Sequence, residues 1–265
     1  MPKINVRDVA LYYEIQGKGP ETLVFLNGVG MTAPLWKPMV DHFLPQYRCL
    51  CHDFRGQLMS DKPEGPYSME MHVADTLALL DALGIDQAHL IGTSYGSEVA
   101  AIFAYTHPQR TRSLTMITGV SEMDAVLRTA VESWATVALS GDSTAFYKSL
   151  LPWSYSAEFL ESHRDFLEAR CREFAQVPKE FFKAFARLVG AFVQINYTHR
   201  LKDITCPALI IAAEKDLIKP PRYSELLHRE IKHSRYHVVP GSGHAVVVED
   251  PDSLNRLLED FLRSL

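Results

Sequence analysis

The chain lacks the features that would link it to a membrane or to nucleic acid. None of its apolar runs reaches the roughly 20 residues that a membrane-spanning helix needs. Its formal net charge is −5, so there is no general excess of the cationic groups that bind phosphate backbones. Residues 1–6 contain no long apolar stretch of the kind found in secretory signals. We therefore expect a cytoplasmic protein, a monomer or small homo-oligomer, with a small-molecule substrate and no nucleic-acid or membrane partner.

Cysteine is also scarce, with 4 in 265 residues. Cys49 and Cys51 flank one residue of an expected strand and should point to the same face, whereas Cys171 and Cys206 are isolated. No grouping of cysteine and histidine has the spacing of a zinc site. We expect reduced thiols, and neither a metal nor an organic cofactor.

What the chain does contain is a regular alternation of short apolar runs and helical patterns. This order is typical of a mainly parallel sheet with helices on both faces. A helix is expected from an N-cap at Ser68 to Gly84 as its C′ residue, and a final helix opens at Asp250-Pro251. Strands are expected at 9–15, 22–26, 48–52, 88–91, 113–118, 208–212 and 236–239.

One long segment interrupts this alternation. Between residues 121 and 196 there is no convincing strand, and apolar residues recur at near-helical spacing, as at Phe181, Phe185 and Leu188. The pattern predicts three or four helices inserted between two core strands, at the carboxyl edge where such sheets bind ligands. We therefore expect a core made of 1–120 and 197–265, covered by a helical cap at 121–196.

The most informative motif is the sequence Gly92-Thr93-Ser94-Tyr95-Gly96. It lies between an expected strand and a run of small residues that reads as a helix. A serine at such a sharp strand-to-helix turn points its hydroxyl outward, and the flanking glycines relieve the crowding. The free N–H groups at the start of the helix are directed at the same place. The motif therefore predicts Ser94 as a nucleophile.

A serine hydroxyl needs a base to take its proton and an acid to orient that base. In a fold of this order, the acid and then the histidine follow on loops after later strands. Asp216 follows the strand expected at 208–212, with Glu214 as the rival acid, and His244 lies on a glycine-rich loop after the last strand. The sequence thus predicts Ser94, Asp216 and His244 as a catalytic triad.

Two further groups of residues are candidates for contact with a substrate. The backbone N–H groups of Tyr95 and of Val29, in the loop after the strand at 22–26, are expected to form an oxyanion hole. Aromatic residues crowd the first half of the cap and suggest an apolar chamber. We expect its walls to include Trp134, Phe146, Trp153 and Tyr155. Three cations of the cap are candidates to meet a substrate carboxylate: Arg128, Lys148 and Arg164. The alternative is that they belong to solvated helix faces.

Taken together, these features resemble the α/β-hydrolase superfamily, in particular its small bacterial carboxylesterases, 3-oxoadipate enol-lactonases, carbon–carbon bond hydrolases and cofactor-free haloperoxidases. The resemblance implies an eight-stranded, mostly parallel sheet with a helical cap inserted after the sixth strand. The segment 52–60 is similar to the family's Asp–x–Arg–Gly–x–Gly–x–Ser pattern, in which Asp53 and Arg55 would be structural. The chain departs from the family at Asn27, where many members have histidine, and at Leu58, where they have glycine.

The expected function is a serine hydrolase that cleaves carboxylic esters or lactones of small to medium apolar substrates through an acyl-enzyme. A carbon–carbon bond hydrolase, or a haloperoxidase or perhydrolase, would use the same triad. A receptor that binds a ligand without turnover remains a third reading, because a fold does not dictate its function.

Overall fold

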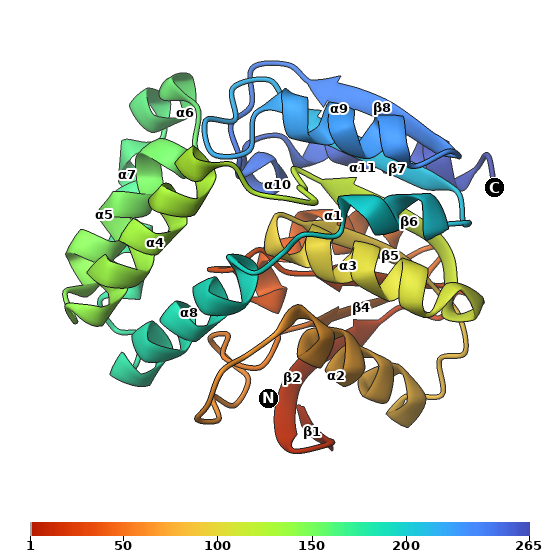
Figure 1. Ribbon diagram of the computed structural model, residues 1–265, viewed down its shortest axis with the longest axis horizontal. Coiled ribbons are helices and arrows are strands. Elements are labelled where there is room, and N and C mark those ends of the chain that lie inside the picture. The colour runs from red at the N-terminus through yellow and green to blue at the C-terminus, as the bar shows by residue number, and fades with distance from the viewer. Residues whose placement is uncertain (1) are drawn as a thin grey trace.

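The computed structural model describes residues 2–265 and contains one eight-stranded sheet (Figure 1). The strand order is β1-β2-β4-β3-β5-β6-β7-β8. Strand β2 is antiparallel to both of its neighbours, and all other neighbouring pairs are parallel. The strands are β1 (Lys3–Val6), β2 (Val9–Gln16), β3 (Thr22–Leu26), β4 (Arg48–His52), β5 (Ala88–Thr93), β6 (Thr111–Ile117), β7 (Ala208–Ala213) and β8 (Ser234–Val239). The predicted fold class is confirmed.

Helices cover both faces of the sheet, and β3 shows how its sequence directs them. All five residues of β3 are buried. Val24 and Leu26 pack in the cluster under α2, α3 and α9, whereas Leu23 and Phe25 pack in the cluster under α1 and α11. The helices are α1 (Lys37–Phe43), α2 (Met69–Ala82), α3 (Tyr95–Thr106), α9 (Pro221–Glu230), the short α10 (Val246–Glu249) and α11 (Pro251–Leu262).

The predicted helix ends are confirmed where a side chain or a glycine sets them. The Ser68 side chain accepts the N–H of Met71 at the start of α2, and Gly84 follows that helix with φ of 64°. Asp250 caps α11 in the same way as Ser68 caps α2. Strand β1 was not predicted. It has four residues, of which only Val6 is buried, so its sequence shows no alternation of apolar and polar residues.

Five α-helices lie between β6 and β7, where three or four helices were predicted, and they gather at one side of the sheet (Figure 1). The count was wrong because α6 spans only six residues, too few to show a helical period. The division into a core (1–120 and 197–265) and a cap (121–196) stays a prediction. The five helices are α4 (Ala125–Leu139), α5 (Ser143–Ser154), α6 (Ala157–Ser162), α7 (Arg164–Phe174) and α8 (Lys179–Phe192).

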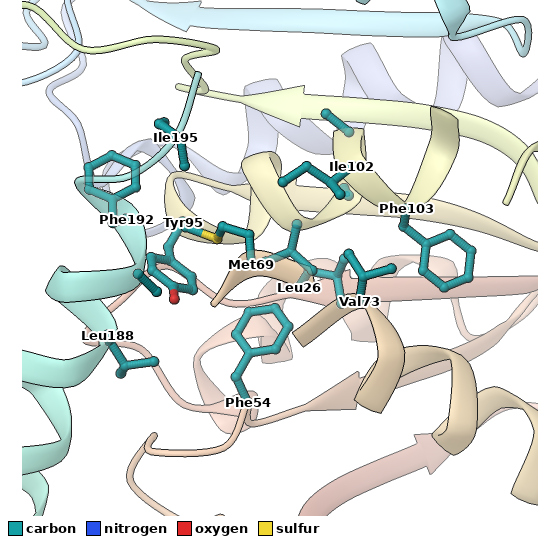
Figure 2. Packing of buried hydrophobic residues seen from close by; sticks show 14 of the residues in the cluster. Leu26, Phe54, Met69, Val73, Tyr95, Ile102, Phe103, Leu188, Phe192 and Ile195 are labelled. Carbon is teal, nitrogen blue, oxygen red and sulfur yellow. The ribbon is translucent and has the colours of Figure 1, made fainter. Parts of the chain in front are cut away.

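The inserted helices join the rest of the chain through apolar packing. Figure 2 shows the ring of Tyr95, at the start of α3, between Phe192 and Leu188 of α8 and Phe54 of the loop after β4. The ring centroids of Tyr95 and Phe192, and those of Tyr95 and Phe54, are both 6.0 Å apart. The residue that follows Ser94 is therefore fixed from both sides.

Candidate active site

Ser94 lies at the turn between β5 and α3, and its backbone is strained. Its φ is 50°, a left-handed value that few residues other than glycine adopt, at a cost of about 1–3 kcal/mol. The Ser94 N–H donates to the carbonyl of Ile117 at 2.8 Å, which helps to hold the turn. A Cβ at Gly92 would lie 2.2 Å from the carbonyl oxygen of Gly96, and one at Gly96 would lie 2.1 Å from that of Leu26. The turn therefore requires both glycines.

This crowding predicts that Gly96→Ala destabilises the protein. The added methyl group would press on the Leu26 and Asn27 carbonyls, which are backbone atoms and cannot rotate away. We expect the free energy of unfolding in urea to fall by about 3 kcal/mol, at the upper end of typical overpacking costs. The matched control is Gly190→Ala in α8, where an added Cβ meets no atom within 4 Å. There alanine should stabilise by up to about 1 kcal/mol, and equal effects at the two sites would contradict the steric argument.

The three residues predicted as a triad lie in one hydrogen-bonded line. The imidazole Nε2 of His244 is 2.8 Å from Ser94 Oγ, and its Nδ1 is 2.6 Å from Asp216 Oδ2. Asp216 is buried on the loop after β7, and its Oδ1 accepts the backbone N–H groups of Ile218 and Lys219 at 2.9 and 2.7 Å. Because a carboxylate only accepts hydrogen bonds, Nδ1 carries the proton and Nε2 is free to accept from the serine hydroxyl.

The rival acid, Glu214, lies elsewhere. Its side chain is exposed, and its Oε2 accepts the backbone N–H of Gly241 at 2.8 Å. The loop that carries His244 is itself held by Glu249 of α10, whose Oε1 accepts the N–H groups of Gly243 and Ser156. Through these two bonds, Glu249 ties the loop of His244 to the junction between α5 and α6.

The loop predicted to supply an oxyanion donor packs directly on the serine. A Cβ at Gly28 would be 3.6 Å from Ser94 Cβ, and Val29 lines the same cavity as Ser94. Tyr95 is the first residue of α3, where backbone N–H groups have no partner within the helix. Val29 and Tyr95 are thus both close neighbours of Ser94, and their role as oxyanion donors stays a prediction.

Buried polar side chains hold this loop, and sequence reasoning missed the central one, Gln57. Its Nε2 donates to the carbonyl of Gly28 at 2.7 Å, and its Oε1 accepts from Asn27 Nδ2 at 3.1 Å. Asn27 also donates to Asp53 Oδ1 at 3.0 Å and accepts from Trp36 Nε1 at 2.8 Å. The asparagine that departs from the family pattern therefore belongs to the support of the loop. Nothing in the sequence around Asn27 shows that its hydrogen-bond partners lie up to 30 residues away.

A cavity of about 150 Å³ opens beside Ser94 and His244 and is lined mainly by apolar side chains. Of the predicted walls, Trp134 and Tyr155 line it, but Phe146 and Trp153 do not. The correction follows from the helical period of α5, because its cavity-facing residues form one stripe. Phe146 lies on another face, with its ring centroid 4.7 Å from that of Phe185, and Trp153 is half-buried. The stripe of α5 that lines the cavity consists of Tyr147, Leu150, Leu151 and Ser154.

The cation at this cavity also differs from those expected. The three candidates, Arg128, Lys148 and Arg164, are all exposed, whereas Arg170 of α7 lines the cavity. Two donors in the lining, Tyr147 Oη and Trp134 Nε1, are buried and make no hydrogen bond within the protein.

The described residues, 2–265, hold no cluster of three or more histidine, cysteine, aspartate or glutamate side chains arranged for a metal ion. Within the same range all four cysteines are free thiols, and Cys49 and Cys51 pack in the same cluster, as their spacing predicts. No helix in this part of the chain has both the length and the apolar character needed to cross a membrane.

Comparison with known proteins places this geometry in a family. A family model described as alpha/beta hydrolase fold matches residues 21–251. A putative carbamate hydrolase, RutD, of Azorhizobium caulinodans is 29% identical over 263 residues, covering 98% of each chain. The 3-oxoadipate enol-lactonase 2 of Acinetobacter baylyi is 26% identical, over 98% of this chain and 96% of the relative.

Solved structures agree with these sequence matches. MGS-M2, an alpha/beta hydrolase enzyme from a Medee basin deep-sea metagenome library, superposes with a TM-score of 0.93 at 28% identity, covering 98% of this chain and 97% of its own. The enol-lactonase from Burkholderia xenovorans LB400 superposes with a TM-score of 0.90 at 25% identity, covering 99% and 100%. The chain therefore belongs to the alpha/beta hydrolase fold family.

Proposed function

We propose that this protein is a serine hydrolase that cleaves carboxylic esters or lactones through an acyl-enzyme. The observation that carries the proposal is the line from Ser94 Oγ through His244 to Asp216, with separations of 2.8 and 2.6 Å, at the wall of a largely apolar cavity. Relatives along the whole chain are named as hydrolases of carbamates and enol-lactones, which supports attack on an acyl carbon.

In the first half of the reaction, Ser94 Oγ attacks the carbonyl carbon while His244 Nε2 takes the hydroxyl proton. Asp216 holds Nδ1–H, which keeps the imidazole in the tautomer that accepts at Nε2 and stabilises the imidazolium that forms. The two backbone N–H bonds to Asp216 Oδ1 keep this carboxylate oriented toward His244. His244 then protonates the leaving alkoxide, and the acyl group remains on Ser94.

The negative charge that develops on the carbonyl oxygen needs fixed donors. The N–H groups of Tyr95 and Val29 are the proposed pair, because the first lies at the N-terminus of α3 and the second on the loop against Ser94. Removing one such donor typically lowers kcat by about 10²–10³-fold. In the second half, His244 activates a water that releases the acid from Ser94, and the hydroxyl regains its proton.

The test is a panel of substrates run on the wild-type enzyme. p-Nitrophenyl esters graded by acyl length, a lactone and a carbamate should show turnover, with a preference for acyl groups that fit a cavity of about 150 Å³. A vinylogous diketone, and acetate with hydrogen peroxide, test for carbon–carbon bond cleavage and perhydrolysis. Turnover of these alone would favour the alternative chemistries, and tight ligand binding without any turnover would favour a receptor.

The position of Arg170 at the cavity leads to a prediction about which charged substrates are accepted. Its side chain is three-quarters buried at the cavity, and its guanidinium pairs with the largely exposed Glu173. Burial raises the pKa of the Tyr147 hydroxyl, and raises that of Tyr155 to about 12, so both stay protonated as donors. Arg170 and these hydroxyls would together suit a substrate that carries a carboxylate away from the scissile bond.

We therefore expect Arg170→Met to lower kcat/KM about tenfold or more for an ester with a terminal carboxylate, as for loss of one charged hydrogen bond. A neutral ester of the same length should be hydrolysed as by the wild type. Arg172→Met, on the same helix but with an exposed side chain, is the matched control. Equal losses on the charged and neutral esters would show that Arg170 does not select for charge.

A further inference from the structure

A buried pair of opposite charges lies beside the triad, and the reaction described above does not use it. Lys219 Nζ is 3.1 Å from both carboxylate oxygens of Glu98, and the two side chains are 3% and 0% exposed. Lys219 Nζ also lies 4.6 Å from the centre of the Phe192 ring, a cation–π contact with α8. The free energy needed to desolvate two charges often exceeds the attraction between them, so a contribution to stability alone does not explain this pair.

The position of each partner relates the pair to catalysis. Glu98 lies in the first turn of α3, four residues after Ser94. Its Oε1 also accepts the backbone N–H of Val120, in the loop after β6, at 2.8 Å. Lys219 lies three residues after Asp216, and its own N–H donates to Asp216 Oδ1 at 2.7 Å. Glu98 thus fastens together the helix of the nucleophile, the loop after β6 and the loop of the acid.

Lys219 also borders the reacting atoms. A second, small cavity of about 20 Å³ is lined by Ser94, His244, Lys219 and Phe192, and its surface is mostly apolar. Burial lowers the pKa of the Lys219 ammonium and raises that of the Glu98 carboxyl, while the attraction between the two opposes both shifts. Each group therefore depends on the other for its charge, and the loss of one leaves the other as a buried charge without its counter-charge.

We propose that Glu98 and Lys219 are a positioning pair that holds Asp216, and through it His244, in line with Ser94. This inference rests on the proposed serine-hydrolase function. Lys219 acts through its backbone N–H on the carboxylate, and its side chain anchors that backbone to α3. Without the anchor, the segment from Asp216 to Lys219 is free to shift, and the Asp216–His244 bond lengthens. Neither side chain takes part in proton transfer.

The experiment compares three variants, with kcat counted per active serine by fluorophosphonate titration. Glu98→Gln and Lys219→Met each leave one buried charge without its counter-charge, so both should lose stability and also lose kcat. In the double variant Glu98→Met/Lys219→Met, no charge is left unpaired, so stability should recover in part; the remaining loss comes from the Val120 N–H, which no longer has an acceptor. If the pair positions Asp216, kcat of the folded double variant stays about 100-fold low with KM unchanged, as for a small misplacement of a catalytic group.

A second buried pair provides the matched control. Arg55 and Asp75 join the loop after β4 to α2 through bonds of 2.5 and 2.8 Å, and their side chains are 4% and 1% exposed. Neither residue lines a cavity with Ser94. Asp75→Asn should lower the unfolding midpoint in urea as Glu98→Gln does, yet leave kcat per active serine at the wild-type value.

Wild-type kcat in the double variant would overturn the proposal, and so would an equal loss of kcat in Asp75→Asn. If the double variant gives no folded protein, Lys219→Met decides, since it removes the anchor while Glu98 still accepts from Val120: a wild-type kcat there also overturns the pair. Ser94→Ala is measured alongside these variants. Activity retained in Ser94→Ala would refute the serine-hydrolase function itself, which separates that failure from a failure of the pair.

Discussion

Replacing Ser94 with alanine should lower kcat for the best ester by about 10⁵-fold or more, in line with the loss of a nucleophile that acts as one unit with its base. The residual rate would come from the oxyanion donors and from substrate binding. Alanine fits the same backbone, and the hydroxyl makes no bond in the structure except to His244 Nε2. The fold should therefore be unchanged.

Three measurements check this expectation: initial rates on the ester panel, urea unfolding of both proteins, and intact mass after treatment with a fluorophosphonate. The wild type should gain one adduct at Ser94, and the variant none. An alanine variant that turns over ester at a rate within tenfold of the wild type would show that another group is the nucleophile.

The second large effect is expected at Asp216. An amide in its place can donate a hydrogen bond to Nδ1, which favours the imidazole tautomer that cannot accept the serine proton at Nε2. Asp216→Asn should therefore lower kcat by about 10⁴-fold while the geometry of the loop is kept. The backbone N–H groups of Ile218 and Lys219 still find an acceptor in the amide oxygen, so stability should change little.

Glu214→Gln is the matched control for this substitution, because it makes the same change two residues earlier on the same loop. Its side chain is exposed and bonds only the N–H of Gly241. Its kcat should equal that of the wild type across the pH range in which the protein is folded. If Glu214→Gln loses activity and Asp216→Asn keeps it, the acid has been assigned to the wrong carboxylate.

The parts of the fold that the sequence predicts well are those set by local pattern. Strands β3 and β4 coincide with their predicted ranges, since each is a short run bounded by turns and buried on both faces. The order of Ser94, Asp216 and His244 could be read because each follows a strand, and parallel strands bring their carboxyl ends to one edge of the sheet. Strand β1 and the six-residue helix α6 are too short to carry a period of their own: β1 was missed, and α6 was not predicted as a separate helix.

What the sequence does not contain is the direction in which each inserted helix faces. Aromatic density around α5 suggested a chamber wall, but it does not distinguish Tyr147, which lines the cavity, from its neighbour Phe146, which packs away from it. Likewise, nothing local marks Arg170 as the guanidinium at the cavity. Glu98 and Lys219 are 121 residues apart, and only the folded chain shows that they meet.

The two faces of α5 divide its residues into those that line the cavity and those that keep the inserted helices together. Phe146 belongs to the second group, packed against Phe185, while Tyr147 and Leu151 belong to the first. Neighbouring positions along one helix serve these separate tasks. Substitutions on the stripe that lines the cavity can therefore change substrate preference, while the aromatic packing on the other face is preserved. A single helix can in this way diversify among descendants of this gene while the five inserted helices stay folded.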